Sequence, residues 1–119
     1  MPRDYKNLKV FHAVDQLVVR VYEATRSFPR EEIFGLTSQM RRAAVSVPAN
    51  IVEGAARHTD AEFAHFLNIS YGSLAESRYF IDLSKRLGYL APEALASLAA
   101  DADEASRMLN GLMKSVRRK

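Results

Sequence analysis

The chain has 119 residues, of which 48% are hydrophobic and 26% are charged, and its formal net charge is +3. This length fits one domain, and this composition is typical of a globular chain with a core, which excludes a disordered or low-complexity protein. Cysteine is absent, so disulfides, thiolate nucleophiles and cysteine-ligated metals are excluded. The polar N-terminus lacks the apolar core of a signal peptide, and no segment reaches the roughly 18 uninterrupted apolar residues of a membrane span. We therefore expect a single domain over residues 1–119, located in the cytoplasm.

Basic residues are concentrated in two parts of the chain. Residues 1–59 carry nine basic and six acidic side chains, residues 60–104 carry three and eight, and residues 105–119 carry five and none. The basic tail contains Lys114, Arg117, Arg118 and Lys119. Its simplest role is a favourable cationic end on the last helix, and the alternative role is attraction of phosphate backbones.

Apolar residues spaced by three and four predict a first helix over about residues 8–27. One stripe consists of Val10, Val14, Leu17, Val21 and Ala24, and a second consists of Phe11, Val18 and Tyr22. Together the stripes cover about half of the helix circumference, which is wider than one core-facing surface needs. Part of this helix is therefore expected to contact something outside its own bundle.

The second predicted helix, over about residues 36–57, has the most informative pattern. Its inner face consists of Leu36, Met40, Ala43, Ala44, Val47, Ile51 and Ala55, and its other side carries Val45, Ala49, Val52 and Ala56. Pro48 lacks a backbone donor, so it either kinks this helix or ends it. We prefer a kink, because the pattern continues past Pro48 without slipping.

A narrow line of polar residues, here called the polar ridge, runs along this second helix. It consists of Gln39, Arg42, Ser46, Asn50, Glu53 and Arg57. Because unpaired buried charge is costly, such a ridge on a mostly apolar helix must be paired or must line something wet. We favour a buried network that fixes helix register, with Glu53 pairing Arg57 or the Arg42 of a neighbour. The alternative is that the ridge faces a subunit interface or the central channel of a ring.

Two further helices have clear end signals. Thr59 and Glu62 form a capping box that begins a helix over about residues 60–87, and Gly88 supplies its left-handed stop. This helix has one apolar stripe of Phe63, Leu67, Leu74 and Ile81, and another of Phe66, Ile69, Phe80, Leu83 and Leu87. Pro92 begins the last helix, over about residues 92–117. Its single narrow stripe, which predicts an outer helix, consists of Leu95, Leu98, Ala102, Ala105, Leu109, Leu112 and Val116.

The three short connections predict an all-α, antiparallel up-and-down four-helix bundle. The surplus apolar stripes on the first three helices predict a homo-oligomer, because a monomer would expose an unusually large hydrophobic patch.

No pattern of catalytic residues is evident. Glu62 and His65 form a Glu-x-x-His pair of the kind that di-iron bundles use, and Glu23 and Glu53 are conceivable as additional carboxylates. A second such pair is missing, and Glu62 already serves the capping box. We therefore expect no enzyme activity, no metal site and no cofactor.

The stretch from Gln39 to Gly54, QMRRAAVSVPANIVEG, resembles the signature of the four-helix-bundle proteins encoded in intervening sequences of bacterial 23S ribosomal RNA genes. The resemblance extends to Tyr5–Leu8 and Phe28-Pro29 upstream, and to residues 72–76, 87–90 and 108–112 downstream. It thus covers nearly the whole chain in the expected order. The residues that carry the family motif are Arg42, Ser46, Asn50, Glu53, Gly54, Gly72, Ser73 and Glu76.

This resemblance implies an up-and-down bundle that forms a ring-shaped homopentamer, so the chain is expected to be a ring-forming protomer. Similar proteins include the accessory protein of diversity-generating retroelements, which works with a reverse transcriptase and RNA. Our leading hypothesis is a non-enzymatic scaffold that binds RNA through basic surface charge. The candidate contacts are Arg41, Arg42, Arg57, Lys114, Arg117, Arg118 and Lys119. The alternative is a protein-interaction adaptor, for example an accessory subunit of a polymerase or reverse transcriptase, with no direct RNA contact.

Overall fold

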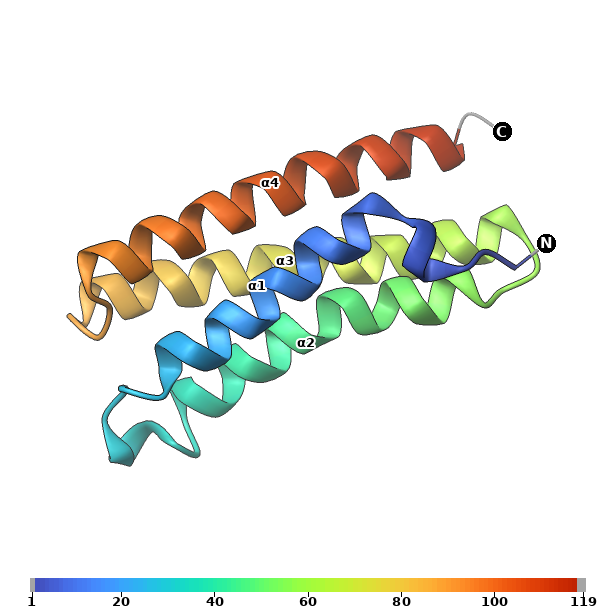
Figure 1. Cartoon of the computed structure of the whole chain (residues 1–119). Coiled ribbons are helices and arrows are strands. Elements are labelled where there is room, and N and C mark those ends of the chain that lie inside the picture. The colour runs from blue at the N-terminus through green and yellow to red at the C-terminus, as the bar shows by residue number, and fades with distance from the viewer. Residues whose placement is uncertain (1, 118–119) are drawn as a thin grey trace.

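The computed structural model describes residues 2–117, and within that range all regular structure is helical. The four main helices are α1 (Lys9–Thr25), α2 (Leu36–Ala55), α3 (Asp60–Arg86) and α4 (Pro92–Arg117), with short 3-10 helices η1 (Tyr5–Asn7) and η2 (Arg30–Glu32). Successive helices run antiparallel (Figure 1). Each packs against its neighbours in sequence and α1 also packs against α4, while the backbones of diagonal pairs of these described helices lie further apart. The predicted all-α four-helix bundle is confirmed, and each main helix packs against two others.

The core is built from the stripes that the sequence pattern predicted. All seven residues of the predicted inner face of α2 are buried. In α1 the first four members of the main stripe are buried and Ala24 is half-buried. In α4 the buried members are Leu98, Ala102, Ala105, Leu109 and Val116. Burial of these faces in one shared interior supplies the main driving force for folding.

Helix α2 continues without interruption through Pro48, which is itself buried. The alternative that the helix ends at this proline is therefore wrong, while the kink expected there stays a prediction. The helix ends at Ala55, two residues earlier than predicted, because the tight turn into α3 begins there. In that turn the Arg57 N–H donates to the Gly54 carbonyl at 3.1 Å.

Helices α2 and α3 approach closely because small residues face each other. Three serines spaced by seven on α3, Ser70, Ser77 and Ser84, are fully buried. The Ser70 hydroxyl donates to the Val47 carbonyl of α2 at 2.8 Å, so it is both small and satisfied. A Cβ placed on Gly54 would lie 2.8 Å from the Cβ of Phe66 and 3.0 Å from a ring carbon of Phe63. The absence of a side chain at position 54 is therefore a condition of this packing.

The ends of α3 are fixed by the predicted signals. The Thr59 hydroxyl accepts the Glu62 N–H at 3.1 Å, so Thr59 caps the first turn. Gly88 has a φ of 74°, a left-handed conformation that favours glycine. The Gly88 and Tyr89 N–H groups donate to the Lys85 and Ser84 carbonyls, which is the Schellman arrangement.

Glu32 joins three parts of the bundle at the end where α1 leads into α2. One carboxylate oxygen accepts the Leu36 N–H at 3.2 Å, and the other accepts the Tyr89 hydroxyl at 2.9 Å. The hydrogen bond to Glu32 raises the pKa of the Tyr89 hydroxyl, and desolvation and the negative charges of Glu32 and Glu31 raise it further. The α1–α2 and α3–α4 connections are thereby tied together.

Candidate interface around helix α2

Helix α2 has two outward faces, one shared with α1 and one shared with α3. The face shared with α1, here called the apolar face, is mostly hydrophobic. It carries Tyr22 and Val45, each 40% exposed, together with exposed Ala49 and Ala56 and half-buried Phe11, Val18 and Val52. The surplus stripe of α1 and the second side of α2 therefore meet on one surface of the protomer. Adjacent apolar residues of this kind are typical of an interaction surface.

The second face, shared with α3, carries the polar ridge. The Ser46 and Ser73 hydroxyls lie 2.8 Å apart across the two helices, and the Asn50 amide donates to the Ser46 carbonyl at 2.8 Å. Arg57 pairs with Glu53 at 2.5 Å, as the spacing predicted. Gln39, Arg42 and Glu53 are exposed, while the other three members are half-buried. Within the protomer the ridge therefore lies at the surface, along the α2–α3 boundary.

A hollow of about 360 Å³ opens on the ridge between α2 and α3. It is lined by Gln39, Arg42, Ala43, Ser46, Ser73, Glu76 and Phe80. Arg42 and Glu76 both reach this hollow, yet Arg42 forms no ion pair with any residue between 2 and 117. Helix α3 also carries apolar side chains that are not fully covered, since Ile69 is 41% exposed and Phe66 and Leu83 are half-buried.

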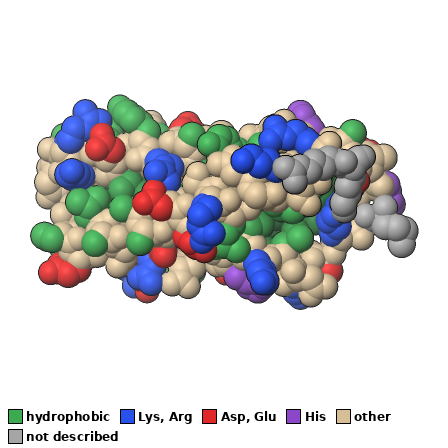
Figure 2. Space-filling view, turned by 90° about the horizontal axis from the view of Figure 1, so that it is seen from above, with side chains coloured by type: hydrophobic (Ala, Val, Ile, Leu, Met, Phe, Trp, Pro, Cys, Tyr) green, Lys and Arg blue, Asp and Glu red, His purple; other side chains and the backbone are tan. Residues whose placement is uncertain are grey.

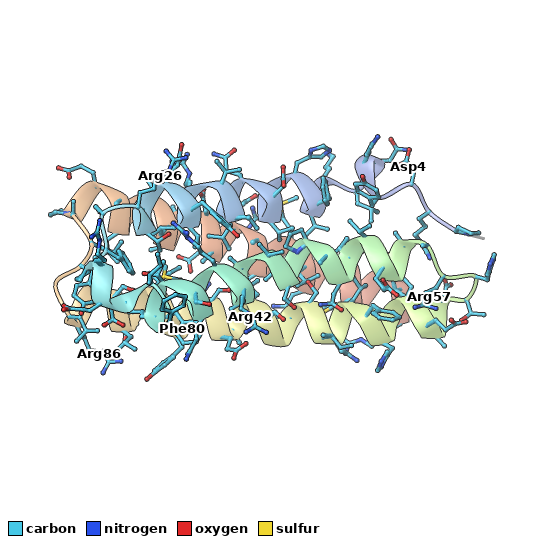
Figure 3. All side chains as sticks on the ribbon, turned by 90° about the horizontal axis from the view of Figure 1, so that it is seen from below. Asp4, Arg26, Arg42, Arg57, Phe80 and Arg86 are labelled. Carbon is cyan, nitrogen blue, oxygen red and sulfur yellow. The ribbon has the colours of Figure 1, made fainter. Side chains whose placement is uncertain are left out.

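The structure separates the arginines that the sequence groups together. The Arg41 side chain donates to the Thr25 hydroxyl at 2.8 Å and lies 4.7 Å from the centre of the Tyr22 ring, so it ties α2 to α1. Arg57 is held by Glu53 and also stacks over Phe66 at 4.8 Å. Arg42 lies in the first half of α2 and Arg57 lies in the turn that follows this helix, so the two are well separated along the bundle (Figure 3).

The basic tail lies elsewhere. Lys114 and Arg117 are exposed in the last turn of α4, diagonally across the bundle from α2. Arg118 and Lys119 lie outside the described residues. The five candidate nucleic-acid contacts that the structure describes thus do not form one continuous patch, and Arg42 of the α2 group forms no ion pair among the described residues.

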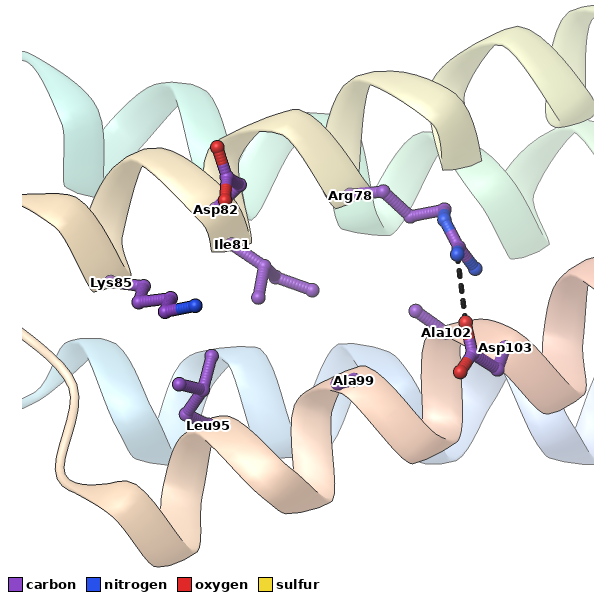
Figure 4. A pocket seen from close by; sticks show the side chains of 8 residues that line it. All are labelled: Arg78, Ile81, Asp82, Lys85, Leu95, Ala99, Ala102 and Asp103. Atoms are coloured by element: carbon purple, nitrogen blue, oxygen red, sulfur yellow. Dashed lines mark ion pairs between the residues drawn. The ribbon is translucent and has the colours of Figure 1, made fainter.

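The opposite side of the bundle has a different character. Between α3 and α4 a hollow of about 340 Å³ has an apolar floor that includes Ile81 and Leu95. Arg78 and Asp103 form a 2.7 Å ion pair at one end of it (Figure 4). Lys and Arg side chains lie among Asp and Glu over the left half of the view from above, whereas Lys and Arg predominate toward its right end (Figure 2). Where the two signs are mixed, around the ion pair of Arg78 and Asp103, the surface has little preference for an anionic partner.

Within residues 2–117, the Glu62 and His65 pair is not joined by a third potential metal ligand. Among residues 2–117, no group of three or more His, Asp or Glu side chains is arranged to hold a metal ion. Glu62 lies beside Thr59 at the start of α3, with 3.2 Å between the Thr59 hydroxyl and its carboxylate. In the same part of the chain, no helix is both long and apolar enough to cross a membrane.

One exposed feature was missed by the sequence patterns. Phe34 is 94% exposed and Ile33 is 53% exposed, both in the connection between η2 and α2. The periodic signals that identify helix faces do not apply to an irregular connection, so the exposure of these two side chains could not be predicted from them.

The order of the helices, the close α2–α3 contact and the ridge can be compared with known proteins. The sequence model described as 23S rRNA-intervening sequence protein matches residues 6–111. The chain belongs to this family. Its structure is similar to that of a protein of unknown function from the S23 ribosomal protein family of Bacteroides thetaiotaomicron, with a TM-score of 0.80 and 26% sequence identity. That similarity covers 88% of this chain and 95% of the other. No functionally curated protein matches this member of the family.

Proposed function

We propose that this 23S rRNA-intervening sequence protein is a non-enzymatic scaffold that assembles into a homopentameric ring and binds RNA in the cytoplasm. The observation that carries the proposal is the pair of neighbouring outward faces that share α2. One is the apolar face, and the other combines the polar ridge with exposed apolar residues of α3. An interface with an apolar centre and satisfied polar groups has the composition of a stable protein contact.

The positions of these faces favour a ring over a two-fold dimer. Two different faces of one protomer make a head-to-tail contact, which closes into a ring when the rotation allows it. Helix α2 is flanked by α1 and α3, so the two faces meet at an angle along α2, and a wedge of about 72° between them would close a five-membered ring. Helix α4 would then lie outside, in agreement with its single buried stripe and charged outer surface.

RNA is the proposed partner because cationic side chains remain available and the family description refers to 23S rRNA. The available groups include Arg42 at the ridge and Lys114 and Arg117 at the end of α4. Contacts of this kind are made to phosphates and carry no sequence preference of their own. Affinity should therefore fall steeply as salt rises.

The first test is the solution mass by light scattering, at low and moderate salt. A mass of five protomers supports the ring, and a stable monomer contradicts it. The second test is titration of a short single-stranded RNA at several salt concentrations. Binding whose logarithm falls linearly with the logarithm of salt supports direct phosphate contact, whereas no binding at low salt contradicts the RNA proposal.

Phe34 favours a second candidate function, a protein-interaction adaptor without direct RNA contact. Its ring is 94% exposed in a connection that lies outside both proposed interfaces. Exposed aromatic side chains are preferred anchors of protein contacts. Salt-insensitive binding of a polymerase or reverse transcriptase that Phe34→Ala abolishes would support this candidate instead.

A further inference from the structure

Helix α2 occupies a special position in the proposed ring. Where two adjacent faces of a protomer are both interfaces, the edge that they share points toward the ring axis. That edge is α2, since the apolar face and the ridge face meet along it. Resting on the proposed ring, the next inference concerns the side chains of α2 that would surround its axis.

Helical geometry places Arg42 on this shared edge. At 100° per residue, Arg42 and Ala49 lie on nearly the same line of α2, directly opposite the buried Met40, Val47 and Ile51. Both Arg42 and Ala49 are exposed. In a ring, the Arg42 side chains of all copies would therefore converge on the axis. The small Ala49 side chains would lie about two helical turns further along it.

The charge of Arg42 is not neutralised by its surroundings in the protomer. Glu76 lines the same hollow but makes no ion pair with it within 4 Å. Glu53 lies three turns along the same side, and its carboxylate is already held by Arg57 at 2.5 Å. Arg41, the adjacent residue, points to the α1 side and bonds Thr25.

Several guanidinium groups in one narrow channel repel one another, and the repulsion is strongest where little water is present. An oxyanion on the axis relieves it, because each guanidinium presents planar donors that match phosphate oxygens. We propose that the assembled ring binds one phosphate-class oxyanion on its axis through Arg42 from several copies. No single protomer contains the complete site.

The test compares Arg42→Gln with Arg107→Gln. The two variants lose the same charge, and Arg107 lies on the outer helix α4, where it pairs with Glu104. Light scattering first establishes that all three proteins have the ring mass. Calorimetric titration with inorganic phosphate and with tripolyphosphate then measures affinity and stoichiometry, and thermal unfolding with and without phosphate gives a second readout.

We expect about one anion per ring for the wild type and for Arg107→Gln, and an affinity at least about tenfold lower for Arg42→Gln, which corresponds to loss of charge-assisted contacts. Phosphate should raise the unfolding temperature of the first two proteins only. A ring whose phosphate affinity is the same in Arg42→Gln overturns the axial site and leaves the scaffold proposal intact. A monomer overturns both.

A further titration distinguishes the two sources of the phosphate group. If a short single-stranded RNA displaces phosphate from the wild-type ring, and Arg42→Gln weakens binding of that RNA, the axial site is an RNA contact. RNA and phosphate that bind together identify a free anion as the occupant. Binding of one phosphate per protomer would contradict an axial site in either case.

Discussion

Gly54→Ala tests how tightly α2 and α3 are packed. The added Cβ would lie 2.8 Å from the Cβ of Phe66 and 3.0 Å from a ring carbon of Phe63. The Cβ of Phe66 is tied directly to the α3 backbone, so it cannot move aside and the two helices must separate. Overpacking of this kind costs about 2–3 kcal/mol, and the better helix propensity of alanine returns about 1 kcal/mol. The expected net loss of stability is therefore about 1–2 kcal/mol.

Thermal and urea unfolding, followed by far-ultraviolet circular dichroism at one protein concentration, measures this loss. For a chain of this length it corresponds to a decrease of about 4–8 °C in Tm. Gly111→Ala is the matched control, because its added Cβ would meet nothing within 4 Å inside α4. That variant should gain about 0.5–1 kcal/mol. If Gly54→Ala is as stable as Gly111→Ala, the argument that close approach requires glycine is refuted.

Three further changes test other parts of the bundle. Thr59→Ala removes the N-cap of α3 and should cost about 1 kcal/mol in urea unfolding, whereas an unchanged midpoint would show that the cap is dispensable. Phe63→Ala empties a fully buried site and should cost about 3–5 kcal/mol; a loss below about 1 kcal/mol would mean that the core refills it. Tyr89→Phe tests the hydrogen bond to Glu32. The folded-state pKa of Tyr89 is raised above 10.0, so this bond stabilises the folded protein fully below about pH 10, and its contribution is lost as the pH rises through that raised pKa. The stability gap between wild type and Tyr89→Phe should therefore narrow as pH rises through that range, and a constant gap would contradict the ionisation argument.

The helices and their inner faces were predictable because each depends on local periodicity. The seven inner residues of α2 are apolar and, apart from the adjacent Ala43 and Ala44, recur at three and four, so burial of one predicts burial of the rest. The serines of α3 were harder to predict. Ser70 and Ser84 are fully buried although neither belongs to an apolar stripe, because each hydroxyl donates to a carbonyl, that of Val47 on α2 for Ser70 and that of Phe80 on the same helix for Ser84.

The polar ridge was predictable as a line of residues, but the role of each member was not. Arg41 and Arg42 are adjacent in sequence, and a rotation of about 100° sends one toward Thr25 of α1 and the other toward the hollow beside α3. Which of the two has a partner depends on residues that are distant in sequence. The pairing of Glu53 with Arg57 needed no such knowledge, since the two are only four residues apart at the end of α2.

The N-terminal segment, the α2–α3 turn and the last turn of α4 all lie at one end of the bundle (Figure 1). A tag or reporter domain fused to either terminus would therefore project from the same pole, and in a ring with cyclic symmetry every copy would project from the same rim. The other rim, which carries the exposed Phe34, would stay unobstructed. Immobilisation through either terminus should thus present this rim to soluble binding partners in a uniform orientation.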